Sequence, residues 1–287
     1  MDFSSFPQLN TYYGGSEKKL AILIGESSYM LKFQKKTPFG FRNNHISEYL
    51  GSHIFQILEF NVQETYLGTY HGQQVVACKN FIGADEQFVP FNDVGESTLD
   101  QDKELYQYSY ADIMQMLKDN SKLTDVKETI TLFWEMFIVD ALIGNFDRHG
   151  GNWGFLKKGN RYRLTPVFDN GSCMFPQMVD EQEMRSVIDS RQATDDRIFK
   201  FPTSQIKLDG KKSSYYEVIS SLAFPECNQA LNTICARTDI ERIIAFVMDM
   251  EDITELHKQF YCHMLRNRYE KILKTANDSY RKHKENV

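Results

Sequence analysis

The polar run DRHGGN begins at Asp147, ends at Asn152 and follows a strongly apolar stretch of the chain. A second aspartate, Asp169, follows in the segment PVFDNG. Between them, Gly159-Asn160 is a favourable pair for a tight turn, and a hairpin centred there would place Asn152 near Val167 on the facing strand. The sequence therefore predicts that Asp147, Asn152 and Asp169 converge despite their separation along the chain.

Two carboxylates and one amide oxygen form a set of hard oxygen ligands, which suits Mg²⁺ and leaves coordination positions for water and phosphate. Phosphoryl transfer fits this set, because it asks a protein for positioning, charge neutralisation and one carboxylate beside the attacking hydroxyl. An Asp followed five positions later by an Asn is also the spacing of a kinase catalytic loop. On that template Asp147 is the catalytic aspartate, and Asn152 and Asp169 are metal ligands.

Two further residues of the same run need an interpretation. His149 has no second His or Cys at ligand spacing, which favours a structural or transition-state role over zinc, so we count it with the catalytic candidates. Arg148 is expected to brace a carboxylate or a backbone carbonyl of the loop. Taken alone, Asp147 and Asn152 are equally consistent with a structural loop, since both residue types form turns. The presence of Asp169 favours the catalytic interpretation.

The kinase template also requires a strand lysine on the nucleotide phosphates and a helix glutamate that orients it. Lys32 lies in the β-prone run SYMLKF, and Glu48 lies in the helical pattern ISEYLGSHI that follows. Alone, each is equally consistent with a solvated surface residue, but their joint order favours an ion pair. Ahead of them, Gly14, Gly15 and Ser16 provide backbone that can approach phosphate closely.

The nucleotide base is expected where the two parts of the chain join. The segment VVACKNF would offer hydrogen bonds there from the backbone of Ala77, Cys78 and Lys79. Ser16 is open to two interpretations, a phosphate contact or a site of autophosphorylation. The expected cofactors are therefore ATP and Mg²⁺.

The elements that must position these residues form an extended first part and a helical second part. Hairpins are predicted with turns at 25–27 and at His71-Gly72, and a helix capped by Asn44 lies between them. Residues 82–107 are polar, acidic and interrupted by Pro and Gly, which indicates a connector or a covering loop. Beyond it, helices are predicted at 110–117, at 126–143, at several places after residue 180 and at 254–276, followed by a solvated tail.

This order of elements predicts an α+β fold with two kinase-like lobes. The expected N-lobe, residues 1–81, is a small antiparallel sheet with one helix, and the expected C-lobe, residues 108–287, is mostly helical, with 82–107 as the connector. At 287 residues with 41% hydrophobic content, the chain is long enough to bury a deep core. A formal charge of -6 argues against broad nucleic-acid binding.

The lack of a recognisable targeting signal in the sequence favours a cytoplasmic location. The first residues lack the basic and apolar regions of a signal peptide, and no stretch is apolar enough for a membrane span. The five cysteines are scattered without a CxxC pair, which suits free thiols in a reducing compartment. Export without a classical signal is compatible with the same sequence.

Several longer segments resemble one known family. DALIGNFDRHGGNWGFL and PVFDNGS are similar to the HipA-like kinases, and YMLKF, SEYLGSHI, VQETYLGTY, VVACKNF and FPTSQIKL resemble its cell-translocating kinase A branch most closely. The similarity extends from about Tyr13 to Tyr269. It implies a compact two-lobed serine/threonine kinase that transfers phosphate to a protein hydroxyl and that also autophosphorylates. The resemblance also implies the roles given above to Asp147, Asn152, Asp169, Lys32 and Glu48.

Two other interpretations of the chain remain open at this point. DRHGGN is also similar to the catalytic loop of phosphoinositide kinases, which makes a lipid or small-molecule kinase an alternative. A nucleotide-binding pseudokinase that acts as an interaction module is another. HipA-like toxins carry an additional N-terminal subdomain, for which a chain with its lysine at position 32 has no room, so toxin-antitoxin DNA complexes do not follow automatically from the resemblance.

Overall fold

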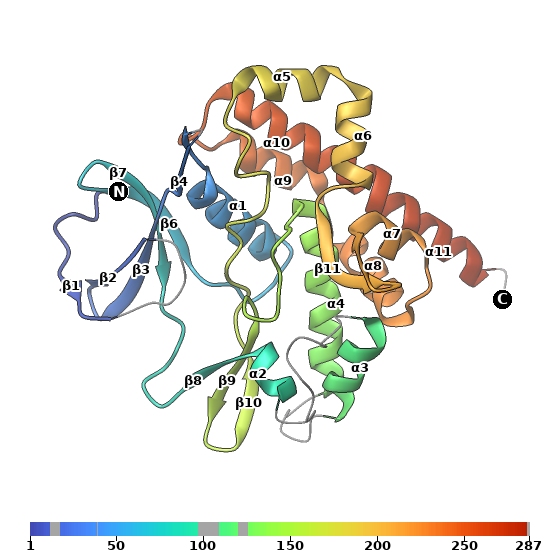
Figure 1. The fold of residues 1–287 in the computed structure, drawn as a ribbon, viewed down its shortest axis with the longest axis horizontal. Coiled ribbons are helices and arrows are strands. Elements are labelled where there is room, and N and C mark those ends of the chain that lie inside the picture. The colour runs from blue at the N-terminus through green and yellow to red at the C-terminus, as the bar shows by residue number, and fades with distance from the viewer. Residues whose placement is uncertain (12–17, 39, 97–108, 120–125, 286–287) are drawn as a thin grey trace.

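The structure is a computed structural model that describes residues 1–11, 18–38, 40–96, 109–119 and 126–285. Gly14, Gly15 and Ser16 lie outside these residues. Figure 1 shows the two parts of the fold, a twisted sheet built from the first part of the chain and a larger helical part built from the rest. The predicted α+β class is confirmed.

The N-terminal sheet has five antiparallel strands in the order β1-β2-β3-β7-β6. Their bounds are β1 Gln8–Leu9, β2 Lys19–Ile24, β3 Ser27–Phe33, β6 Thr65–Tyr70 and β7 Gln73–Lys79. Both predicted hairpins are present. His71 and Gly72 adopt left-handed backbone with φ of 46° and 74°, as a two-residue turn of the type that matches strand twist requires.

Helix α1, Asn44–Ile57, packs against β6 and β7. The predicted cap by Asn44 is wrong, because this residue is already helical and the preceding Asn43 makes no capping side-chain bond. Instead, Asn44 Nδ2 donates to the Phe33 carbonyl at 3.0 Å and its Oδ1 accepts from the Lys35 N–H at 2.9 Å. The first turn of α1 is thereby tied to the end of β3. A short ribbon, β4 Lys36–Thr37 with β5 Gly40–Phe41, lies between them.

The expected connector is partly ordered into regular structure. Residues Gln87–Pro90 form strand β8 and Phe91–Glu96 form helix α2, so the prediction of an irregular segment is wrong for 87–96. β8 joins β9, Gly154–Lys158, and β10, Arg161–Leu164, in a three-stranded antiparallel sheet of order β10-β9-β8. β9 and β10 turn at Gly159-Asn160, as predicted.

The helical part is arranged around α4, Val126–Ile143, which is buried along most of its length. The other helices are α3 Tyr110–Asp119, α5 Glu181–Asp189, α6 Arg191–Phe199, α7 Tyr215–Ser220, α8 Pro225–Arg237, α9 Ile240–Met248 and α10 Glu255–Arg268. A π-helical turn, Tyr269–Lys274, continues α10 into α11, Thr275–Glu285. The helix predicted to end near residue 276 therefore extends to Glu285, and the tail expected at 280–287 is helical over its described residues.

One hairpin, β11 Thr203–Leu208 with β12 Lys211–Ser214, lies beside α7. All five cysteines are free, as the sequence predicted. In the ranges that the structure describes, no helix combines the length and the apolar character needed to cross a membrane.

Candidate active site

Lys32 lies on β3 with its ammonium between two carboxylates from different elements. Lys32 Nζ is 2.7 Å from Oε2 of Glu48, on α1, and 2.9 Å from Oδ1 of Asp169, in the segment after β10. Lys32 is 5% exposed and Glu48 1% exposed. Three positions separated by as many as 137 residues therefore meet at one point, as the sequence predicted.

The charges of this cluster stabilise one another. Burial disfavours the Lys32 ammonium, but Asp169 and Glu48 outweigh it and raise the pKa of Lys32 well above its usual value. Burial acts against the Asp169 carboxylate as well, but Lys32 lowers the pKa of Asp169 below its usual value. Lys32 and Asp169 are therefore both charged at neutral pH. The Asp169 side chain is still 39% exposed, so it can contact a further ligand.

The backbone around Asp169 holds it against α1. Glu48 Oε1 accepts a hydrogen bond from the Asn170 N–H at 2.9 Å, while its other oxygen binds Lys32. Gly51, one turn further along α1, has no room for a side chain, since an added Cβ would lie 2.5 Å from Asn170 Cβ. This glycine allows the close approach of helix and loop.

The predicted catalytic loop is folded by bonds within itself. Asn152 Nδ2 donates to the Asp147 carbonyl at 2.8 Å, and the Asn152 N–H donates to the His149 carbonyl at 2.8 Å. His149 Nδ1 accepts from the Gly151 N–H, and its Nε2 lies 3.9 Å from Asp147 Oδ1. The side chains of Asp147 and His149 are 46% and 45% exposed, so both can reach a substrate.

Arg148 connects this loop to Asp169 and to α4. Its guanidinium makes two bonds to the Asp140 carboxylate, at 2.9 and 3.1 Å, and binds Asn170 Oδ1. It also donates to the carbonyls of Asn152, at 3.1 Å, and of Phe168. Arg148 is thus a brace for the loop, as predicted, and it joins the two segments that carry the predicted metal ligands.

Asp140 is the residue that the sequence reading missed. It lies on the last turns of α4, is 1% exposed and binds both Arg148 and the Asn145 side-chain amide, the latter at 3.0 Å. Burial opposes the Arg148 charge, but Asp140 raises the pKa of Arg148 above its usual value. The available signal was an aspartate inside the apolar run WEMFIVDALI, since a buried carboxylate needs a partner.

The segment expected to contact the nucleotide base lies within the sheet. Ala77 and Cys78 are inside β7, which pairs with β3 on one side and β6 on the other. The Lys79 N–H donates to the Glu64 carbonyl at 2.9 Å, and the Lys79 carbonyl accepts from Gln63 Nε2 at 2.9 Å. The Asn80 N–H also donates to the Ser28 carbonyl at 2.8 Å, so the backbone of this segment is bonded to neighbouring strands and loops of the protein.

Comparisons with known proteins show the family of this chain. The model of the HipA-like C-terminal domain matches residues 11–245. The chain belongs to this family. Serine/threonine-protein kinase CtkA of Helicobacter pylori strain J99 is 36% identical over 272 residues, which are 92% of this chain and 82% of that protein.

Two solved structures extend the comparison. The crystal structure of the H. pylori proinflammatory kinase CtkA aligns with a TM-score of 0.91 and 33% identity over 98% of each chain. HipA of Shewanella oneidensis MR-1, solved with HipB and operator DNA, aligns with a TM-score of 0.56 and 15% identity over 95% of this chain and 65% of that one, which supports the fold alone. The protein is thus a serine/threonine kinase of the HipA-like family, and the expected family, fold and enzyme class are confirmed.

Proposed function

We propose that this kinase transfers the γ-phosphoryl group of Mg-ATP to a Ser or Thr hydroxyl of a protein at the site formed by Lys32, Asp147, Asn152 and Asp169. The observation that supports these roles best is the position of Lys32 Nζ, 2.7 Å from Glu48 and 2.9 Å from Asp169. Fixing an ammonium beside an exposed carboxylate prepares a place for phosphates and their metal.

In this proposal Glu48 holds Lys32 and Lys32 holds the phosphates. Glu48 is almost completely buried and also binds the Asn170 backbone, so it cannot turn away from Lys32 without losing two contacts. The Lys32 ammonium is then available in a fixed orientation. Its charge can neutralise phosphate oxygens without reorganisation during the reaction.

The donors at the site fit Mg²⁺. Asp169 provides a partly exposed carboxylate, and Asn152 uses its amide nitrogen on the Asp147 carbonyl, which leaves its amide oxygen for another contact. No cluster of three or more His, Cys, Asp or Glu side chains suited to a metal occurs in the described part of the chain, so phosphate oxygens would complete the shell. When bound, Mg²⁺ would neutralise charge on the transferred phosphoryl group.

Asp147 is proposed to orient the acceptor hydroxyl. Its carboxylate is half exposed, and its backbone N–H is held by Asn145 Oδ1 at 3.1 Å. A fixed backbone with an exposed carboxylate suits a group that accepts the hydrogen of an incoming hydroxyl. His149, 3.9 Å from Asp147 Oδ1, is placed to contact the same substrate.

Further parts of the proposal concern the surroundings of the site. We place the base contacts on backbone after Lys79, and we keep the N-lobe, connector and C-lobe at 1–81, 82–107 and 108–287. Autophosphorylation, with Ser16 as one candidate acceptor, remains part of the proposal. A cytoplasmic location is supported by five free cysteines, most of them buried, and the net charge of -6 supports the expectation of no broad nucleic-acid binding.

The test is phosphate transfer from labelled ATP to three acceptors, namely the protein itself, a basic protein and lipid vesicles. We expect labelled Ser or Thr in the protein arms and its loss in Asp147→Asn, while Asp209→Asn, in the exposed β11–β12 turn, retains it. Transfer only to lipid would contradict the acceptor class. ATP binding with no transfer to any acceptor would indicate an interaction module and overturn the proposal.

A further inference from the structure

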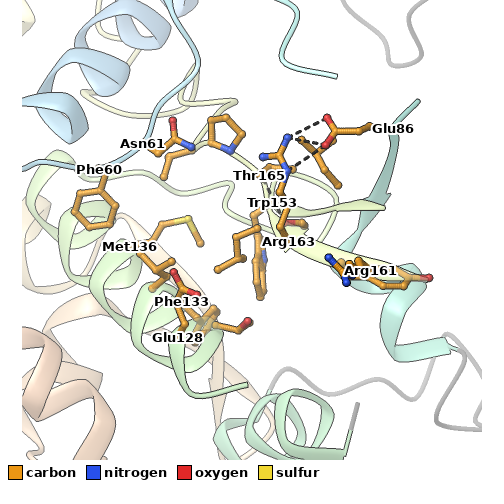
Figure 2. A pocket seen from close by; sticks show the side chains of 18 of the residues that line it. Phe60, Asn61, Glu86, Glu128, Phe133, Met136, Trp153, Arg161, Arg163 and Thr165 are labelled. Carbon is orange, nitrogen blue, oxygen red and sulfur yellow. Dashed lines mark hydrogen bonds and ion pairs between the residues drawn. The ribbon is translucent and has the colours of Figure 1, made fainter. Parts of the chain in front are cut away.

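A cavity of about 730 Å³ lies between the first half of α4 and the edge strand β10. Figure 2 shows it from close by, with α4 on one wall and the β9–β10 hairpin on the other. None of the proposed catalytic, metal or phosphate-binding residues lines it. Its volume is within the range of small-molecule sites, about 300–1,000 Å³. It is a second place where the chain has room for a ligand.

The floor of the cavity is apolar. Phe133 and Met136 face it from α4, and Trp153 and Val167 face it from the segments that flank the hairpin. The rings of Phe133 and Trp153 lie 5.2 Å apart, centroid to centroid, and tilt by 39°. A ligand with a flat or flexible apolar part would bind this floor best, because each methylene or ring edge in contact with the floor is removed from water.

The cations at the rim differ in how they are neutralised. Arg163 makes a forked pair with Glu86, from Nε to Oε1 at 3.1 Å and from Nη2 to Oε2 at 2.9 Å, and Lys158 lies 3.5 Å from Asp85. Arg161 is exposed and has no ion-pair partner among the residues that the structure describes. The rim thus presents one guanidinium that can bind an anion in a fork.

We propose that this cavity binds a small amphipathic anion. Its aromatic or aliphatic body would lie against Phe133, Met136 and Trp153, and its anionic group would bind Arg161. Glu128, which lines the cavity from α4, would repel that group and so direct it toward β10. This proposal does not rest on the proposed phosphoryl-transfer site.

Two residues that line the cavity are close in sequence to the proposed metal ligands. Trp153 directly follows the proposed metal ligand Asn152, and Val167 precedes Asp169 by two residues. Val167 is also fixed by backbone bonds, donating to the Asn61 carbonyl at 2.8 Å and accepting from the Gln63 N–H at 2.9 Å. A ligand in the cavity would therefore contact the neighbours of both proposed metal ligands.

The proposal is tested with the full chain and 1-anilinonaphthalene-8-sulfonate, a flat aromatic anion whose fluorescence rises in apolar sites. Titrations are made without ADP and with saturating ADP, so that any binding at the nucleotide site is recognised by its displacement. We expect saturable binding that decanoate displaces. Leu132→Trp, which fills the cavity, should abolish it.

Two charge variants give opposite expectations. Arg161→Gln should weaken binding about 5-fold, the size of one exposed ion pair, whereas Glu128→Gln should leave it unchanged or tighten it. Arg185→Gln, on exposed α5, is the matched control and should have no effect. Absence of binding, binding that ADP displaces, or binding that Leu132→Trp and Arg161→Gln leave unchanged would overturn the proposal.

Discussion

Arg148 and Asp140 form a forked ion pair at the centre of the molecule, with N–O distances of 2.9 and 3.1 Å. The remaining donors of Arg148 reach the carbonyls of Asn152 and Phe168 and the side chain of Asn170. The pair thereby connects the end of α4 to the catalytic loop and to the segment of Asp169. Arg148 therefore holds in place the two segments that carry the proposed metal ligands.

Replacing Arg148 by Lys keeps the charge but removes the fork, so one ammonium cannot satisfy five acceptors. We expect kcat to fall about 100-fold, the cost of a misplacement on the order of 1 Å at the reacting groups, with a smaller rise in the KM for ATP. Steady-state kinetics on folded protein measures both constants. An Arg148→Lys enzyme with unchanged kcat would contradict the positioning role.

The matched control is Arg163→Lys, because Arg163 makes a similar forked pair with Glu86 but on the surface. Its activity and thermal stability should stay close to those of the unmodified protein, since exposed pairs contribute little.

Breaking the buried Arg148–Asp140 pair with Asp140→Ala should cost about 3–5 kcal/mol of unfolding free energy.

Glu48→Gln tests the orientation of Lys32. The amide can still accept from the Asn170 N–H, but it no longer attracts the ammonium, so we expect kcat/KM for ATP to fall about 10- to 100-fold, the value of one charge-assisted hydrogen bond. Glu26→Gln, in the exposed β2–β3 turn, is the control. Equal kcat/KM in the two variants would show that Lys32 needs no carboxylate on α1.

The sequence was sufficient to predict that Lys32, Glu48 and Asp169 lie together. Lys32, Glu48 and Asp169 were predicted from the kinase template, and the hairpin turns at His71-Gly72 and Gly159-Asn160 were predicted from local turn chemistry. The signals for the hairpins and helices are local, because a turn is specified by two residues and a helix by its own periodicity.

The features that the sequence did not predict depend on distant partners. β8 ends in proline and obtains its strand geometry from pairing with β9, 67 residues later, which no local pattern shows. Asn44 has the residue type of a cap, but its side chain binds the end of β3 instead. Asp140 is a charged residue within an apolar helix, and its role follows only from its pairing with Arg148 in the folded structure.

Gly51→Ala tests the contact between α1 and the Asp169 segment. Alanine favours a helix by up to about 1 kcal/mol over glycine, but its Cβ would meet Asn170 Cβ at 2.5 Å and Cys173 Sγ at 3.0 Å. We expect lower thermal stability and lower kcat. Gln56→Ala, at an exposed position of the same helix, should change neither, and a fully active, more stable Gly51→Ala protein would argue against the tight contact.

His45 provides a prediction about pH. It is 4% exposed, its Nδ1 has no partner in the described part of the chain, and burial lowers its pKa from 6.5 to about 4. Between these values the unfolded chain binds the proton and the folded chain does not, so stability falls as the pH drops from about 6.5 to about 4.

The contribution of His45 is at most about 3 kcal/mol. Urea unfolding at pH 7, 6, 5 and 4.5 should therefore show a shallower loss of stability in His45→Gln than in the unmodified protein. His283→Gln, at an exposed position of α11, is the control. Parallel pH profiles for the His45→Gln and unmodified proteins would mean that this imidazole is protonated in the fold.

The most direct test of the whole account is the single-turnover rate of phosphate transfer from labelled ATP in Asp169→Asn, at saturating Mg²⁺. The change removes the carboxylate that binds Lys32 at 2.9 Å and is the proposed metal ligand. We predict a loss of at least about 1,000-fold, on the scale of a missing group that stabilises transition-state charge, with Asp209→Asn unchanged. Transfer by Asp169→Asn at the rate of the unmodified protein would contradict the proposed site.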